Sequence, residues 1–404
     1  MNDKLIWIKN RQFQLQGNIK QVAPLLENFT LDQVSRVERF HRTYGQFEET
    51  PLRKLDALAR NVGVNQIFVK DESYRFGLNA FKVLGGVYAL GQYVAKLLEK
   101  DIEELSFEEL KLPEVKKQLG DLIFISTTDG NHGRGVAWAA RELGFKARIY
   151  MPQGSAEERL QNIKNEGAYA EITNMNYDDT VRYTSQLAAE NGWIIVQDTM
   201  WEGYEEIPLW IMQGYTTLMK EVVNQLEEAP THVFLQAGVG SFASAMVAFL
   251  QQYYEQDITY VLVEPHAANC YYESFKKGTE QSVNVGGAMH TIMAGLACGE
   301  PSPVAWDILK TYTQVSISCE EEVAATGMRV LGNPIGSDTS IIAGESGAAP
   351  LGCFYTIMSD SEYQDLKEVL KLNTTSRVLF ISTEGDTDVN NYRDIMWHGK
   401  YPTT

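Results

Sequence analysis

The chain has 404 residues, which is enough for two domains at roughly 100–200 residues each. Its net charge of −18 at pH 7 argues against binding to nucleic acid or to an anionic membrane surface, and it favours a cationic substrate. Residues 1–7 lack the apolar core of a signal peptide, and no uninterrupted apolar run is long enough to span a bilayer. We therefore expect a cytoplasmic protein that acts on a small molecule.

Strand-like and helix-like patterns alternate along the chain, which indicates an α/β fold with a parallel sheet. Helical patterns such as 181–190 and 209–226 separate the apolar strand-like runs. The acidic stretch 101–109 is interpreted as an exposed insertion. Strands are expected at 66–70, 122–126, 147–151, 193–197, 232–236, 259–263 and 378–382.

The first segment that suggests chemistry is a lysine where a polar loop meets an apolar helix. Lys82 follows the expected strand 66–70 and a polar segment, and it precedes the apolar run 83–90. Lysine is seldom buried without a partner. A desolvated lysine has a lowered pKa and becomes a good amine nucleophile, which suits Schiff-base chemistry with a carbonyl cofactor. The alternative interpretation is a lysine that reaches from a helix start to the surface.

The second segment, 121–133, has the pattern of a strand, a tight polar turn and the start of a helix. Asn131 can donate a side-chain hydrogen bond into a site, and the N-terminus of the following helix favours anions. Asp129 or Asn131 could instead serve as a helix cap, because caps prefer these residue types. Capping alone does not explain Asp, Gly, Asn, His and Gly in succession.

The third segment, 233–245, runs from a buried strand through a turn of small residues into a helix. Glycines let the backbone approach a phosphate, and the helix start supplies N–H groups. The segment lacks the third glycine of the dinucleotide fingerprint, which weakens a nucleotide-binding alternative. A glycine-rich turn with a purely geometric role is the other alternative. The predicted phosphate ligands are Gly238, Val239, Gly240 and Ser241.

Taken in chain order, these segments resemble the fold-type II pyridoxal-phosphate enzymes, the superfamily of threonine dehydratase and tryptophan synthase β. The resemblance implies two open, mostly parallel sheets flanked by helices, with a large cofactor-binding domain formed by 1–84 and 202–404 and a small domain at 85–201. Further matches are Thr-Pro-Leu at 50–52, Gly-Asn-His at 130–132, Tyr-Asp-Asp at 177–179, Val-Glu-Pro at 263–265, Thr-Ile-Met-Ala-Gly-Leu-Ala at 291–297 and Glu-Ser-Gly-Ala at 345–348.

Three stretches, 73–82, 128–135 and 196–199, resemble one branch, the diaminopropionate ammonia-lyases. This resemblance implies a homodimer that eliminates ammonia from D- and L-2,3-diaminopropionate to give pyruvate and a second ammonia. The alternative is a serine or threonine dehydratase of the same fold. Those relatives carry Ser-Ser or Ser-Ala before Gly-Asn-His, where this chain has Thr128 and Asp129.

The resemblance also implies how the cofactor, pyridoxal 5'-phosphate, is held. Lys82 would form the Schiff base, Asn131 would bind the ring hydroxyl, and the turn 238–241 would bind the phosphate. A hydroxyl at the end of the last strand would contact the pyridine nitrogen. Thr383 is preferred for that contact and Ser382 comes second, and both could instead cap the strand end. No metal site is expected.

Two aspartates are implied as bases, Asp129 and Asp198. D- and L-amino acids present their α-protons to opposite faces of the cofactor, and a general base must lie within hydrogen-bonding reach of its proton. Asp129 would serve as a base, as a partner of the second amine, or as both. Asp198, at the end of strand 193–197, could instead be a turn or cap residue before Thr199.

Several other residues keep two interpretations. His132 could orient the loop or cap the helix. Tyr177 could close over the cofactor or simply pack its ring against neighbours. Glu345 could bind a cation, as in relatives, or belong to a plain backbone turn. The glycine-rich stretch 278–299 is a mobile lid or a crossing between subunits. The four cysteines lack C-x-x-C spacing, so we expect reduced thiols, with a pairing of the first two left open. They are Cys270, Cys298, Cys319 and Cys353.

Overall fold

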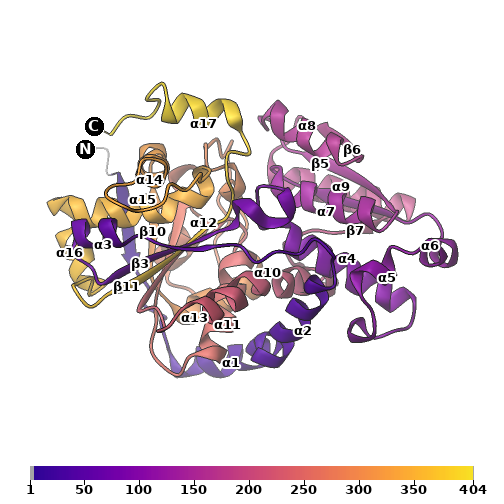
Figure 1. The fold of residues 1–404 in the computed structure, drawn as a ribbon, viewed down its shortest axis with the longest axis horizontal. Helices are drawn as coiled ribbons and strands as arrows, with labels where there is room; N and C mark the ends of the chain where they lie inside the picture. Colours follow the sequence, from indigo (N-terminus) through magenta and orange to yellow (C-terminus); the bar gives the residue numbers. More distant parts are fainter. Residues whose placement is uncertain (1–3, 404) are drawn as a thin grey trace.

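The structure, a computed structural model, describes residues 4–403. Its strands form a seven-stranded sheet in the order β1-β10-β9-β8-β11-β3-β2 and a four-stranded sheet in the order β6-β5-β4-β7. Only the edge strands β1 and β2 run antiparallel to their neighbours. Helices cover the sheets, which lie in separate halves of the molecule (Figure 1). The predicted α/β class with two mostly parallel sheets is confirmed.

All seven predicted strands form, and the bounds of all but β8 differ from those predicted. The larger sheet holds β1 (Leu5–Lys9), β2 (Leu52–Lys54), β3 (Gln66–Asp71), β8 (His232–Gln236), β9 (Thr259–Pro265), β10 (Thr313–Cys319) and β11 (Arg377–Ser382). The smaller sheet holds β4 (Ile123–Thr127), β5 (Lys146–Met151), β6 (Tyr169–Ile172) and β7 (Ile194–Ile195).

The strand predicted at 193–197 is shorter than expected, because its end is used differently. The Thr127 N–H of β4 donates a hydrogen bond to the Gln197 side chain at 2.9 Å. A longer β7 would offer a main-chain carbonyl at this place. The chain then turns away and carries Asp198 to the end of the sheet. Side-chain bonding has therefore replaced the last ladder bond beside the candidate site.

The helices begin and end close to the predicted patterns at 181–190 and 209–226, which lie within α9 and α10 apart from the last residue of the second pattern. The helices are α1 (Gln16–Leu26), α2 (Leu31–Arg42), α3 (Asp56–Val62), α4 (Val83–Leu97), α5 (Phe107–Leu110), α6 (Pro113–Leu119), α7 (Asn131–Glu142), α8 (Glu157–Asn165), α9 (Tyr177–Asn191), α10 (Glu206–Gln225), α11 (Ser241–Tyr253), α12 (Cys270–Lys277), α13 (Pro303–Tyr312), α14 (Glu321–Gly332), α15 (Glu345–Ser359), α16 (Gln364–Val369) and α17 (Val389–Met396). Among these described helices, none combines the length and the apolar character needed to cross a bilayer.

The acidic stretch 101–109 is only partly the exposed insertion that the sequence predicts. Its charged side chains are exposed, whereas Ile102 and Phe107 are buried in the main hydrophobic cluster. Phe107 packs edge-on against Phe40 at 6.1 Å between ring centroids. The insertion is therefore anchored by two apolar side chains that the surrounding charges concealed.

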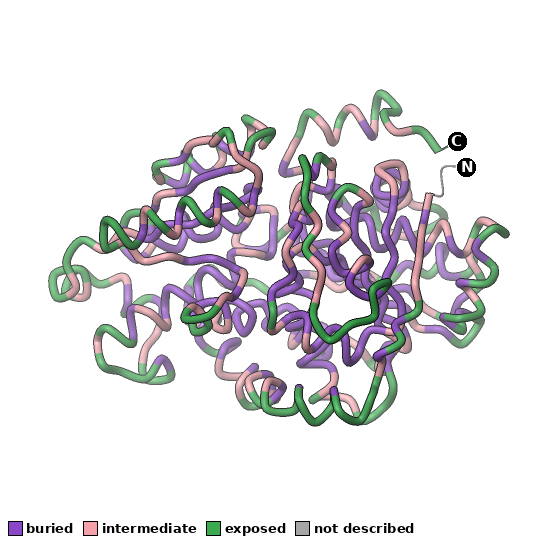
Figure 2. Tube along the Cα trace, turned by 180° about the vertical axis from the view of Figure 1, so that it is seen from behind, coloured by how far each residue is buried: buried purple, intermediate pink, exposed green. Residues whose placement is uncertain are grey.

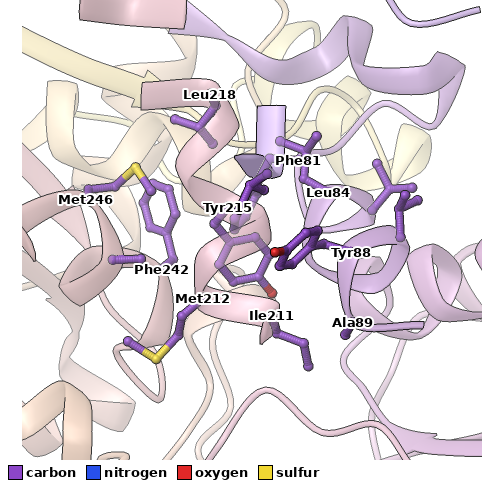
Figure 3. Close-up of a cluster of buried hydrophobic side chains, with 14 of the residues drawn as sticks. Phe81, Leu84, Tyr88, Ala89, Ile211, Met212, Tyr215, Leu218, Phe242 and Met246 are labelled. Atoms are coloured by element: carbon purple, nitrogen blue, oxygen red, sulfur yellow. The ribbon is translucent and has the colours of Figure 1, made fainter. Parts of the chain in front are cut away.

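Buried residues run along the strands and along the inner sides of the helices in both halves (Figure 2). The two halves meet at α4 and α10. These helices can pack closely because Gly214 has no side chain: a Cβ there would lie 2.6 Å from the Leu84 carbonyl oxygen. Phe81 sits 4.7 Å from both the Tyr215 and the Phe242 rings, measured between centroids (Figure 3). This aromatic cluster fixes the backbone immediately before Lys82.

Candidate active site

One cavity lies where the carboxyl ends of strands from both sheets face each other, the position at which open α/β sheets bind ligands. It contains about 610 Å³ of space not filled by protein atoms. Every residue predicted for catalysis or cofactor binding lines it: Lys82, Asp129, Asn131, Asp198, Gly238, Val239, Gly240, Ser241 and Thr383. Ser382, the second choice for the pyridine nitrogen, is not among the lining residues.

Lys82 immediately precedes α4 and points its amine between two carboxylates. Its Nζ donates to Asp198 Oδ2 at 3.0 Å and lies 4.0 Å from Asp129 Oδ1. Burial lowers the pKa of Lys82, but attraction to these two carboxylates is stronger in sum and raises it above its ordinary value. The expected lowering of this pKa is therefore wrong, because the sequence did not reveal two acidic partners.

Asp198 follows β7 and is held from two sides. Its Oδ1 accepts a hydrogen bond from the Tyr177 hydroxyl at 3.3 Å, and its main-chain oxygen accepts one from Ser241 Oγ at 2.5 Å. Burial acts to raise the pKa of Asp198, but the charges and hydrogen bonds of Lys82, His132 and Tyr177 lower it to about 2. The carboxylate is thus ionised at neutral pH, and it faces the amine instead of capping a turn.

Asp129 lies in the turn between β4 and α7. The Thr128 hydroxyl accepts hydrogen bonds from the N–H groups of Gly130 at 2.8 Å and Gly133 at 3.0 Å. Thr128 therefore performs the capping that the alternative interpretation assigned to Asp129 or Asn131. The Asp129 carboxylate instead faces Lys82 on one side and Arg159 Nη1 at 3.4 Å on the other.

The glycine turn after β8 is shaped by a tyrosine behind it. Gly240 has φ +93°, and a Cβ there would lie 1.9 Å from the Tyr271 hydroxyl oxygen. That hydroxyl donates to the Val239 carbonyl at 2.9 Å. The buried Glu264 carboxylate in turn accepts from the Tyr271 N–H at 2.8 Å and thereby holds the start of α12. The free N–H groups in the first turn of α11 complete a cradle suited to an anion.

Thr383 lies opposite this cradle. Its Oγ1 accepts a hydrogen bond from Gln236 Nε2 at 2.8 Å, so its own proton is free to be donated into the cavity. Ser382 Oγ instead donates to the Glu384 carbonyl at 3.4 Å. Asn131 donates its side-chain amide to the Glu384 carboxylate, a contact that the sequence did not suggest.

The remaining candidates lie around the cavity in supporting positions. His132 is fully buried and bonds through Nε2 to the Val196 carbonyl at 2.9 Å, and burial lowers its pKa. Tyr177 lines the cavity, and Gln197 Nε2 donates to its hydroxyl at 2.8 Å. Glu345 accepts from Asn391 at 2.6 Å, and burial raises its pKa to about 7.

The stretch 278–299 is irregular except for the short helix η5 (Ala294–Leu296), and its end lines the cavity through Leu296 and Cys298. Cys270 and Cys298 are separate buried thiols, with Cys270 Sγ 3.6 Å from the Cys298 carbonyl oxygen. Within 4–403, no three His, Cys, Asp or Glu side chains are arranged to hold a metal ion.

The cavity fits pyridoxal phosphate. A lysine amine, an anion cradle and a free hydroxyl donor converge on it, which matches the carbonyl, the phosphate and the ring nitrogen of that molecule. Four buried atoms of lining residues also have no hydrogen-bond partner in the described part of the chain: Tyr215 Oη, Gln236 Oε1, Ser346 Oγ and Glu384 Oε1. Unsatisfied buried polar atoms are rare in folded proteins, so these four indicate a polar ligand.

Comparisons with known proteins agree with the geometry. The family model for "Pyridoxal-phosphate dependent enzyme" matches residues 44–375. Diaminopropionate ammonia-lyase of Escherichia coli K12 is 53% identical over 386 residues, which cover 94% of each chain. The Salmonella typhimurium LT2 enzyme of that name is 49% identical over 89% of this chain and 91% of its own length.

Among solved structures, the holo diaminopropionate ammonia-lyase of Escherichia coli superposes with a TM-score of 0.90 at 50% identity and covers 98% of both chains. The match thus extends over nearly the whole fold, including the cavity that joins the two sheets. The chain belongs to the pyridoxal-phosphate-dependent enzymes and, within them, to the diaminopropionate ammonia-lyase family.

Proposed function

We propose that the protein holds pyridoxal phosphate on Lys82 and eliminates ammonia from both enantiomers of 2,3-diaminopropionate. One observation carries the proposal: two carboxylates on separate turns, Asp198 and Asp129, lie 3.0 and 4.0 Å from the same lysine amine. In the reaction the substrate loses its α-proton and its β-amine. The remaining enamine takes up water to give pyruvate and the second ammonia.

The cofactor supplies an electron sink for the negative charge that develops on the substrate's α-carbon. The chain supplies the groups that orient it. The turn 238–241 would hold the phosphate, Thr383 would donate a hydrogen bond to the pyridine nitrogen, and Asn131 would bind the ring hydroxyl. A neutral hydroxyl at the ring nitrogen suits elimination, because it leaves that nitrogen largely unprotonated.

Lys82 and Asp198 act as a pair. The Lys82 amine donates a hydrogen bond to Asp198, and attraction to the carboxylates raises the pKa of the amine. An amine must lose its proton before it can attack a carbonyl, because the unprotonated amine is the nucleophile. Asp198 holds the amine in position, and both groups would lie within reach of a substrate proton in the cavity.

Asp129 approaches the cavity from the turn after β4, whereas Asp198 follows β7. A carboxylate at that place suits the β-ammonium group of a diamino acid and repels an α-carboxylate. Serine and threonine lack the second amine and cannot use this contact. Asp129 thus accounts for a preference for diamino acids, and it provides a second base for one enantiomer.

The test is product formation by the purified protein loaded with pyridoxal phosphate, with D- and L-2,3-diaminopropionate, D- and L-serine and L-threonine as substrates. We expect pyruvate from both diaminopropionate enantiomers, with kcat/KM well above that for serine. Faster turnover of serine or threonine than of diaminopropionate would overturn the proposal in favour of a dehydratase.

Three further features remain proposals: a homodimeric state, a cytoplasmic location, and the division into 1–84 with 202–404 and 85–201. The sheet composition supports the division, because all seven strands of the larger sheet fall in the first part and all four of the smaller sheet in the second. Light scattering of the purified protein tests the homodimer directly.

A further inference from the structure

A buried arginine lies beside the candidate base. Arg159 belongs to α8, next to the smaller sheet, and its side chain is only 3% exposed. Its Nη1 lies 3.4 Å from Asp129 Oδ2, and its Nη2 lies 3.9 Å from Glu345 Oε2 and 4.0 Å from Glu384 Oε2. Nothing in the mechanism above uses this guanidinium.

The arrangement joins parts of the chain that are distant in sequence. The three carboxylates come from the β4–α7 turn, the start of α15 and the turn after β11, and the guanidinium comes from α8. On the far side, Asn391 of α17 donates to Glu345 at 2.6 Å. A buried ion pair contributes little to net stability, so stability alone does not account for a cation surrounded by three acids.

Asp129 has few charged neighbours. The uncharged side chains around it are Tyr177, Tyr215, Cys298 and His132: burial raises the pKa of the first three and lowers that of the histidine. Among the described residues, its cationic partners within 4.0 Å are Lys82 and Arg159. Lys82 lies closer to Asp198 and is committed to the cofactor, whereas a guanidinium keeps its proton throughout.

We propose that Arg159 is the positioning residue for Asp129: its guanidinium holds the carboxylate aimed into the cavity, toward the reacting α-carbon. Arg159 would then control turnover of the enantiomer that relies on Asp129. This inference rests on the proposed function. Glu345 and Glu384 attract the other guanidinium nitrogen from 3.9 and 4.0 Å, which favours this position of Arg159 beside Asp129.

The first test compares three variants of the holoenzyme with both diaminopropionate enantiomers. Arg159→Gln should lower kcat/KM for the Asp129-dependent enantiomer about 10–100-fold more than for the other, because a misplaced catalytic group costs on that order. Arg159→Lys keeps the charge and should recover part of the loss. The control is Arg141→Gln, since Arg141 pairs with Glu166 at the end of α8, away from the cavity. An unchanged ratio of the enantiomers in Arg159→Gln would overturn the proposal.

The second test does not require turnover. The protein is labelled with ¹³C at the aspartate side-chain carboxyl carbons, and the Asp129 resonance is assigned by its loss in Asp129→Asn. In Arg159→Gln the chemical shift of this resonance should move away from the parent value, and in Arg159→Lys it should fall between the two. Equal chemical shifts in all three proteins refute the proposal. If the parent does not act on diaminopropionate, the proposed function fails while this measurement still decides the role of Arg159. Should Arg159→Gln not fold, Arg159→Lys carries both measurements.

Discussion

Substituting alanine for Gly240 should selectively weaken cofactor binding. The added Cβ would lie 1.9 Å from the Tyr271 hydroxyl oxygen, whereas non-bonded Cβ contacts are essentially never shorter than 3.0 Å. Tyr271 must therefore shift by about 1 Å and loses its hydrogen bond to the Val239 carbonyl, worth about 0.5–1.5 kcal/mol. The left-handed φ of +93° adds about 1–2 kcal/mol for any residue with a Cβ.

Together these costs come to about 1.5–3.5 kcal/mol. They fall on the turn that forms the phosphate cradle, which corresponds to roughly 10- to 300-fold weaker binding of pyridoxal phosphate, since each 1.4 kcal/mol is a factor of ten. The assay is absorbance titration of the cofactor-free protein with pyridoxal phosphate. Tyr271→Phe in the same chain should recover only part of the affinity, because the ring carbon Cζ would still lie 2.6 Å from the new Cβ.

The matched control is Gly278→Ala at the end of α12. Gly278 also has a positive φ, +66°, but the nearest atom to its added Cβ is 3.8 Å away. This variant shares the backbone strain without the clash and lies outside the cradle, so it should lose stability but not cofactor affinity. Parent-like affinity in Gly240→Ala, or an equal loss in both variants, would refute the reasoning about the cradle.

Three other predictions concern the charged groups. Asp129→Asn should lower kcat/KM for the D-enantiomer by about 10²–10⁴-fold and spare the L-enantiomer. The L-enantiomer should depend more on Asp198 or on Lys82. If Asp129→Asn and Asp198→Asn both keep the parent D-to-L ratio of kcat/KM, a single base with substrate reorientation is the better account. Lys82→Ala should abolish nearly all turnover with either enantiomer, measured as pyruvate release, and substantial remaining activity would remove Lys82 from the mechanism. Burial raises the pKa of Glu345 in the folded protein to about 7, against an ordinary value of 4.5. Between these pH values the folded state binds more protons than the unfolded state, so the free energy of unfolding should fall as the pH rises through this window. Glu345→Gln should make the decline of the melting temperature between pH 5 and pH 7.5 shallower, and an unaltered slope would contradict this assignment.

The apolar strands and the order of the motifs were accessible from the sequence, because both leave local signals. The strand β10 was missed although it is buried, because Thr313, Ser316 and Ser318 break its apolar pattern. The edge strands β1 and β2 were missed because they are short and half-exposed, and their pairing is long-range. Such strands are recognised only through partners far away in the chain.

The candidate site likewise contains residues with a local sequence signal and residues that only long-range contacts identify. The lysine, the two aspartates and the glycine turn lie in recognisable local contexts, and the structure brings them to one cavity. Gln236, Glu384 and Arg159 have no local signature, because their roles arise from contacts with residues more than 25 positions away. The direction of the Lys82 pKa was missed for the same reason, since it depends on carboxylates from two other turns.

The most direct test of the central claim is borohydride reduction of the holoenzyme followed by peptide mass spectrometry. Reduction fixes the cofactor to the lysine that holds it, and among the residues that the structure describes Lys82 is the one lysine lining the cavity, beside Asp129 and Asp198. We predict a pyridoxyl adduct on Lys82. Lys70 is the informative comparison, because it is fully buried as well but is paired with Glu221 at 2.7 Å in a separate ion cluster. An adduct on Lys70 or on any other lysine would contradict the account.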